Sequence, residues 1–440
     1  MDVGNDMKRS DIRKGTVRLV GFSLAVFIII HLVYVLRLNS CTHEGRETSN
    51  RESTYWSDTL ANSMSQIPGL EPMDKEIERF MQKWEIKGIS LAVTRHDSLL
   101  YAKGYGWADR QAGVQMETSS IMRMASASKL VTAVGIMKLC EEGKLSLDSK
   151  VFGEEGILND TSYTNAMRDP RMKDITIDHL LRHKGGFTLG AGDPMFNTKD
   201  IMAVKKLTTP PTNEELTRIV LGRRLGFTPG AGRRYSNFGY MLLSLVIERV
   251  TGKSYWDFVR EEVLEPAGAY QFRPATNYYA ERHDKEVRYY PPDNELVEEF
   301  NGSGRMVERV YGGSNVNGLL GAGGWLASAS DLARLVAAID GEPGVENILS
   351  PESINALTAY DEKDNMSRGW TEVRPNGIWI RTGTLSSTHA LIERFPEGDC
   401  WVILTNSGVW TGHHFSKDLE RLVERLRSRY EDKMPKRNLW

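Results

Sequence analysis

Residues 121–129 read Ile121-Met122-Arg123-Met124-Ala125-Ser126-Ala127-Ser128-Lys129, and apolar residues at helical spacing follow as far as Gly143. The pattern predicts a helix that begins near Ser126. Residues three positions apart share one helical face, so the Ser126 hydroxyl and the Lys129 ammonium can meet. The helix N-terminus adds positive potential and free backbone N–H groups. Because a desolvated lysine can accept a hydroxyl proton, the spacing predicts Ser126 as a nucleophile and Lys129 as its base.

A second motif, Tyr235-Ser236-Asn237, lies about a hundred residues further on. It matters because a bare Ser-x-x-Lys arises by chance roughly once or twice in a chain of this length. A tyrosine beside a lysine ammonium has a lowered pKa and can carry a proton, so Tyr235 is the predicted partner of Lys129. Asn237 can donate to or accept from a substrate amide. The alternative is a loop tyrosine followed by an asparagine turn.

A third motif, Arg381-Thr382-Gly383-Thr384, comes at the end of a strand-like run. Glycine there allows a substrate to approach the backbone closely. The N–H groups of Thr384 and Ser126 are the predicted oxyanion hole. The planar fork of Arg381 suits a carboxylate and stays charged near neutral pH, so we expect a substrate with an acidic group. A structural salt bridge of Arg381 is the alternative.

Strand patterns lie towards both ends of the chain, at 88–94 and 99–107 and again at 377–381, 388–395 and 400–405. Between them, most of the periodic segments are helical. This distribution predicts an α/β (α+β) fold in which both ends build one antiparallel sheet flanked by helices, with a mainly helical inserted domain.

Together these motifs resemble those of the class C β-lactamases, the related esterases and the D-alanyl-D-alanine peptidases. Four further segments match motifs of that family, and all of them follow the family's order from about Met73 to Leu426. They are Leu139–Asp148 after the nucleophile, Leu180–Gly186 (LLRHKGG), Gly323–Leu332 (GGWLASASDL) and Leu404–Ser407 (LTNS). The resemblance implies a β-lactamase/transpeptidase-like fold for most of the chain.

The resemblance also implies roles for the motif residues. Ser126 would be acylated, while Lys129 and Tyr235 would manage its proton. Asn237 and Arg381, with the rest of that third motif (Thr382, Gly383, Thr384), would hold the substrate. No metal and no organic cofactor is implied. The expected activity is cleavage of an ester, amide or lactam, and an esterase or D-amino-acid peptidase is favoured over a dedicated β-lactamase because Arg381 replaces the usual lysine.

Two other functions use the same motifs. One is acyl transfer, in which an alcohol or amine replaces water in the second step. The other is a membrane-tethered receptor that binds penicillin or peptidoglycan peptides without turnover, which the intact Ser126, Lys129 and Tyr235 argue against.

The bulk composition is that of a globular protein, with 40% hydrophobic and 26% charged residues in 440. A formal net charge of −2 provides no general attraction for nucleic acid, so a nucleic-acid partner is not expected. The three cysteines are too few for a disulfide framework and match no zinc pattern.

The run Leu19–Leu36 carries no formal charge and is about the minimum length that spans a bilayer. Five basic residues precede it, whereas Arg37 alone follows closely, so the N-terminus is expected in the cytoplasm and the catalytic domain outside, in the periplasm or extracellular space. Lipidation at Cys41 and a cleaved signal peptide are the alternatives. The predicted segments are a cytoplasmic end 1–18, a membrane anchor 19–36, a polar stalk 37–66, a hydrolase domain 67–430 and a tail 431–440.

Three features near the motifs bear on the shape of the site. The stretch Thr384–His389 has bulkier residues where relatives often have glycines, and it should narrow the site beside the strand. The long segment Thr188–Pro211 covers the site or forms a surface loop. His183 and His389 are expected to be structural histidines.

Overall fold

The computed structural model describes residues 55–187, 192–293, 295–360 and 367–440. The predicted membrane anchor at 19–36 lies outside these residues. Within the described part of the chain, no helix combines the length and the apolar character needed to cross a membrane.

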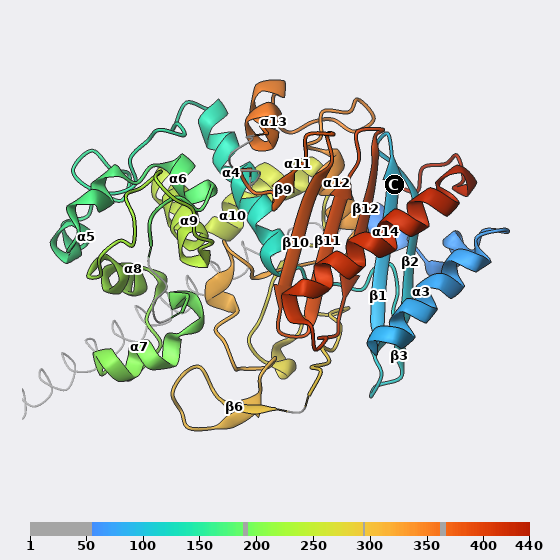
Figure 1. Cartoon of the computed structure of the whole chain (residues 1–440), viewed down its shortest axis with the longest axis horizontal. Coiled ribbons are helices and arrows are strands. Elements are labelled where there is room, and N and C mark those ends of the chain that lie inside the picture. Colours follow the sequence, from blue (N-terminus) through green and yellow to red (C-terminus); the bar gives the residue numbers. More distant parts are fainter. Residues whose placement is uncertain (1–54, 188–191, 294, 361–366) are drawn as a thin grey trace, which may run out of the picture. The chain divides into compact units, whose positions relative to one another are not determined.

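One seven-stranded sheet dominates the fold, in the order β3-β2-β1-β12-β11-β10-β9. All neighbouring strands are antiparallel. The strands are β1 (Gly88–Arg95), β2 (Ser98–Asp109), β3 (Val114–Gln115), β9 (Glu372–Val373), β10 (Trp379–Leu385), β11 (Thr388–Arg394) and β12 (Asp399–Thr405). Because β1 pairs with β12, both ends of the chain build the sheet, which confirms the arrangement predicted from the sequence (Figure 1).

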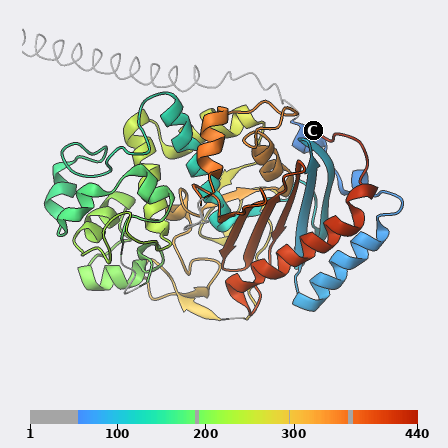
Figure 2. The same cartoon turned by 45° about the horizontal axis from the view of Figure 1, so that its top comes forward.

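Helices cover both faces of this sheet. α3 (Glu71–Trp84) and α14 (Ser416–Tyr430) lie side by side on one face, as both views show (Figures 1 and 2). α4 (Ser128–Glu141) and α12 (Ala329–Ala337) pack on the other face. Side chains alternate between the two layers, so that in β11 Leu391 packs towards α14 while Ile392 packs towards α4.

The remaining elements are short or belong to the helical region between the strands. The helices are α2 (Trp56–Thr59), α5 (Thr161–Ala166), α6 (Ile177–Leu181), α7 (Thr198–Lys205), α8 (Asn213–Leu221), α9 (Asn237–Thr251), α10 (Tyr255–Val259), α11 (Glu265–Ala267) and α13 (Pro351–Thr358). The small strands are β4 (Met122–Arg123), β5 (Arg273–Pro274), β6 (Leu296–Glu298), β7 (Met306–Glu308) and β8 (Trp325–Ala327).

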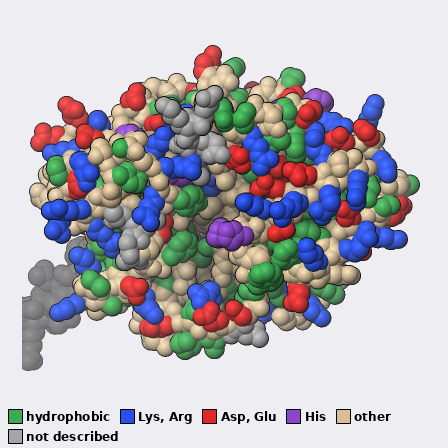
Figure 3. Space-filling model, viewed as in Figure 1, with side chains coloured by type: hydrophobic (Ala, Val, Ile, Leu, Met, Phe, Trp, Pro, Cys, Tyr) green, Lys and Arg blue, Asp and Glu red, His purple; other side chains and the backbone are tan. Residues whose placement is uncertain are grey.

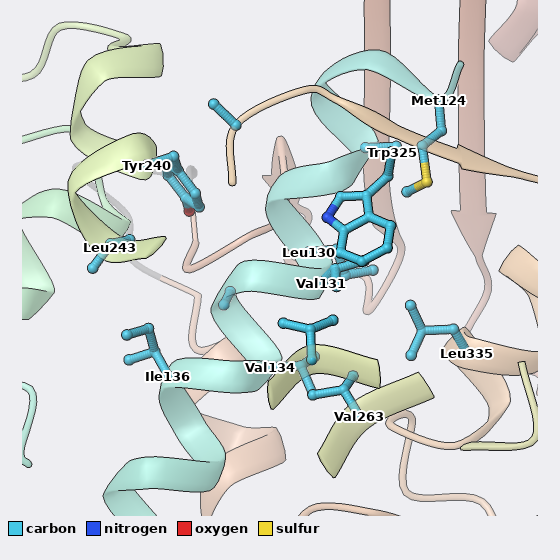
Figure 4. Close-up of a cluster of buried hydrophobic side chains, with 14 of the residues drawn as sticks. Met124, Leu130, Val131, Val134, Ile136, Tyr240, Leu243, Val263, Trp325 and Leu335 are labelled. Atoms are coloured by element: carbon cyan, nitrogen blue, oxygen red, sulfur yellow. The ribbon is translucent and has the colours of Figure 1, made fainter. Parts of the chain in front are cut away.

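The helix that follows the nucleophile is buried on nearly every side. Leu130, Val134 and their neighbours on α4 contact Leu243 of α9, Trp325 of β8 and Leu335 of α12 (Figure 4). A helix that is apolar all round is stable only inside a core. This burial fixes the position of Ser126, which lies immediately before the helix.

The structure differs from the predicted boundaries in three places. β10 continues to Leu385, four residues beyond the predicted strand, because pairing with β11 extends to Leu385 and Thr388. Residues 55–66, expected in the stalk, instead pack on the domain, where the Asn62 side chain donates to the Met116 carbonyl at 2.8 Å. The expected tail also packs, since the Trp440 indole donates to the Asp97 carbonyl at 2.8 Å.

Candidate active site

Ser126 lies in a single turn of 3-10 helix, Ala125–Ala127, directly before α4. Ala125 has φ of +50°, a left-handed conformation that is uncommon for a residue with a side chain. The Ser126 Oγ accepts a hydrogen bond from the Tyr235 hydroxyl at 2.6 Å and lies 3.3 Å from the Lys129 Nζ. The two residues expected to handle its proton therefore both reach it.

The Lys129 side chain is fully buried. Its Nζ donates to the Asn237 Oδ1 at 2.7 Å and to the Ala322 carbonyl at 2.5 Å, and lies 4.8 Å from the centre of the Tyr235 ring. Burial is the main cause that lowers the pKa of Lys129, and it outweighs the opposing attraction of Tyr235. A lysine with a lowered pKa is a better proton acceptor near neutral pH.

Tyr235 precedes α9 and points its hydroxyl at the nucleophile. Burial raises the pKa of this phenol, but the positive charges of Lys129 and Arg381 lower it by more, so that the pKa lies below its ordinary value. The hydroxyl thus has a short hydrogen bond to Ser126 and an environment that favours loss of its proton. This is the arrangement a proton relay requires.

Asn237 is the first residue of α9 and is held by an acidic residue that sequence reasoning missed. The Asn237 backbone N–H and its Nδ2 both donate to the Asp193 Oδ2, at 2.8 and 3.0 Å. These bonds turn the amide so that its oxygen faces Lys129. Asp193 comes from the segment 188–211, which therefore does reach the site. The sequence offered one indication of this role, because Asp193 is an acidic residue in a segment that was considered as a cover for the site. No sequence pattern linked Asp193 to Asn237.

Arg381 is buried and contacts the nucleophile turn itself. Its Nε donates to the Ser126 carbonyl at 2.9 Å, and its Nη2 donates to the same oxygen. The sequence predicted that the Arg381 guanidinium would be free to bind a substrate carboxylate. In the structure, two of its N–H donors are instead bonded to the Ser126 backbone carbonyl. The expected alternative, a salt bridge of Arg381, is also not found among the residues that the structure describes. Arg381 instead adds positive charge beside Tyr235 and Lys129.

Thr382, Gly383 and Thr384 lie inside β10, alongside the nucleophile turn. A β carbon at Gly383 would lie 2.3 Å from the Met124 carbonyl oxygen and 3.1 Å from the Ser126 nitrogen, so only glycine permits this approach. The Thr382 N–H donates to the Thr371 Oγ1 at 3.0 Å, on the edge of β10 that faces away from β11. Alternate N–H groups of a strand point to the same edge, so the Thr384 N–H is directed there as well.

The two histidines are placed as structural residues. His183 is buried, stacks 4.4 Å from the Tyr235 ring and accepts the Ser236 N–H at its Nδ1. Burial is the largest cause that holds its pKa well below the usual range, so its ring is neutral and supports Tyr235 by packing. His389 is buried against Phe415, where burial lowers its pKa to about 4.

Comparisons with known proteins indicate the family of this chain. A family model described as Beta-lactamase matches residues 73–414. Protein flp of Staphylococcus aureus is 26% identical over 215 residues, 49% of this chain and 40% of flp. Esterase EstB of Burkholderia gladioli is 30% identical over 205 residues, 44% of this chain and 49% of the esterase. The matches therefore span half or less of these relatives' lengths.

Solved structures with the same fold cover more of the chain. A D-amino acid amidase from Ochrobactrum anthropi, complexed with L-phenylalanine, has a TM-score of 0.62 and 20% identity, covering 82% of this chain and 98% of the amidase. A penicillin-binding protein from Bacillus halodurans has a TM-score of 0.61 and 20% identity, covering 80% of this chain and 99% of that protein. At this level of identity the likeness concerns the fold.

Proposed function

Because the chain belongs to the beta-lactamase family, which includes serine hydrolases such as esterases and amidases, we propose that it cleaves an ester, amide or lactam bond through an acyl-Ser126 intermediate. One observation carries the proposal: the Ser126 Oγ lies 2.6 Å from the Tyr235 hydroxyl and 3.3 Å from the Lys129 Nζ. A serine hydroxyl attacks a carbonyl only when its proton has such an acceptor.

In the first step, the Ser126 Oγ attacks the substrate carbonyl carbon while its proton passes to Tyr235, whose hydroxyl proton in turn passes to Lys129. The N–H groups of Ser126 and Thr384 stabilise the negative oxygen of the tetrahedral intermediate. The proton then moves to the leaving alcohol or amine as its bond to the carbonyl breaks. In the second step water attacks the acyl-enzyme carbonyl and loses a proton to the same relay. The relay returns that proton to the Ser126 Oγ as the acyl–Oγ bond breaks, which releases the acid and restores the serine hydroxyl.

The substrate is expected to be small, or a peptide, with an anionic group. Arg381 contributes to this preference through its charge, since its Nε and Nη2 are bound to the Ser126 carbonyl. Such an electrostatic contribution favours an anion without the bidentate geometry expected from the sequence. An Arg381→Lys variant would keep the charge and therefore most of the preference for anionic over neutral esters.

A serine-directed fluorophosphonate tests the proposal. The purified full chain and its Ser126→Ala variant would be exposed to the reagent, weighed by intact-mass spectrometry and mapped by peptide analysis. A stoichiometric adduct on Ser126, absent from the variant, with turnover of a small ester, supports a hydrolase. A folded protein without an adduct would refute an activated nucleophile and favour a receptor, and an adduct without turnover would favour acyl transfer or stable acylation.

We also propose that residues 19–36 anchor the chain in a membrane with the N-terminus in the cytoplasm. The proposal follows from the charge-free apolar run and from the basic residues that precede it. Protease added to cells from which any outer membrane and wall have been removed should degrade the hydrolase domain while sparing the N-terminal segment. Complete protection of the domain would contradict the orientation.

A further inference from the structure

A face of basic side chains lies on the side of the sheet opposite Ser126. Its members are exposed and recur at four-residue spacing: Lys75, Arg79 and Lys83 on α3, and Lys417, Arg421, Arg425 and Arg429 on α14. Residues four apart share one side of a helix, so each helix presents a row of positive charge. Figure 3 shows Lys and Arg side chains across the region where α14 runs in Figure 1. We call these seven residues the basic face.

The two rows border a groove of about 520 Å³, which is lined by five of the seven basic residues and by two acids. Glu76 pairs with Arg425 at 3.2 Å and Arg429 at 3.0 Å, while Asp418 pairs with Arg421 at 3.2 Å. Two acids against five cations leave the groove positive, although the whole chain has a net charge of −2. Like charges four residues apart destabilise a helix, so helix stability alone does not explain the pattern.

Two tryptophans, the partly buried Trp84 and the exposed Trp410, continue this surface at the C-terminal end of α3. The Lys83 Nζ lies 4.9 Å from the centre of the Trp84 ring, and Trp84 lies 6.3 Å from Trp410. Trp410 is 83% exposed, although tryptophan usually buries its large apolar ring. Basic residues beside exposed tryptophan are typical of surfaces that contact a membrane interface.

We propose that the basic face docks on an anionic phospholipid bilayer, with its cations on lipid phosphates and Trp410 in the headgroup region. Docking is favoured by charge complementarity with the lipid phosphates and by the adjoining tryptophan, and it is independent of the hydrolytic step. It is strengthened by the proposed anchor at 19–36, because the chain between the anchor and Tyr55 reaches at most about 60 Å when extended. The sheet separates the basic face from Ser126, so docking leaves the nucleophile on the other side.

Lysine footprinting of the full chain tests this proposal directly. The protein would be reconstituted in nanodiscs of phosphatidylcholine alone, or with about one third phosphatidylglycerol, and acylated briefly before mass spectrometry. We expect phosphatidylglycerol to slow modification of Lys83 and Lys417 about threefold or more, and 1 M NaCl to abolish the effect by screening. Lys173 and Lys205, which are exposed elsewhere, should react equally in both lipids. Equal effects on all four lysines, or none, would overturn the proposal.

Two double variants distinguish an effect of the basic face from an effect of the total charge of the protein. Arg79→Gln with Arg421→Gln should remove most of the lipid protection of Lys83 and Lys417, whereas Lys206→Gln with Lys436→Gln loses the same charge elsewhere and should retain it. Ester turnover should be the same in both pairs, so a failure of docking is distinguishable from a failure of the hydrolase proposal. If soluble heparin protects these lysines and phosphatidylglycerol does not, the partner is a soluble polyanion and the membrane proposal is wrong.

Discussion

Gly383→Ala tests how closely β10 must approach the nucleophile turn. The added β carbon would lie 2.3 Å from the Met124 carbonyl oxygen, whereas ordinary contact begins at 3.4 Å, so strand and turn must separate by about 1 Å. Such overpacking costs about 1–3 kcal/mol of stability. A displacement of about 1 Å at reacting groups lowers the rate about 100-fold, or about 2.7 kcal/mol of transition-state stabilisation.

The assay is kcat/KM on a small ester, with the melting temperature measured on the same samples. Gly323→Ala is the matched control, because its β carbon would meet the same turn at ordinary distances, 3.7 Å from the Ala125 carbonyl oxygen and 4.0 Å from the Ser126 nitrogen. The control should keep kcat/KM within about threefold, as expected for an ordinary contact. A folded Gly383→Ala protein with kcat/KM within threefold of the native chain would refute the reasoning.

Three other perturbations have directions fixed by the structure. Tyr235→Phe should lower kcat/KM on the same ester about 100-fold or more while leaving the melting temperature nearly unchanged, since only the relay hydroxyl is lost. Asp193→Ala frees the Asn237 amide and removes a negative charge that raises the pKa of Lys129. We expect kcat/KM to fall about tenfold and the acid limb of its pH profile to move to lower pH. An unchanged acid limb would contradict the influence of Asp193 on the pKa of Lys129. Glu393 is buried without a hydrogen-bond partner among the described residues, and burial raises its pKa to about 8. Its contribution to stability is therefore full below about pH 4.5 and is lost as the pH rises through 8. By denaturant unfolding, the native chain should lose on the order of 5 kcal/mol relative to Glu393→Gln over that range. Parallel pH curves for the two proteins would refute this.

The motifs and their order were sufficient to predict the fold. Ser126 and Lys129 are three residues apart, so local helical geometry alone brings them to one side. Short strand-like runs bounded by turn residues likewise predicted the strands at both chain ends. The sequence also predicted that strands from the two chain ends pair in one sheet, and the pairing of β1 with β12 confirms this prediction.

Contacts between distant residues were decided only by the tertiary structure. Asp193 meets Asn237 across 44 positions of sequence, and no periodicity or spacing links a loop acid to a helix start. Arg381 was expected to face a substrate, yet the packing of β10 on the nucleophile turn brings its donors onto the Ser126 carbonyl. The basic face likewise arises only because α3 and α14, more than three hundred residues apart, pack side by side on one sheet. Local patterns fix what each segment can form, whereas the burial of all segments together fixes which side chains meet.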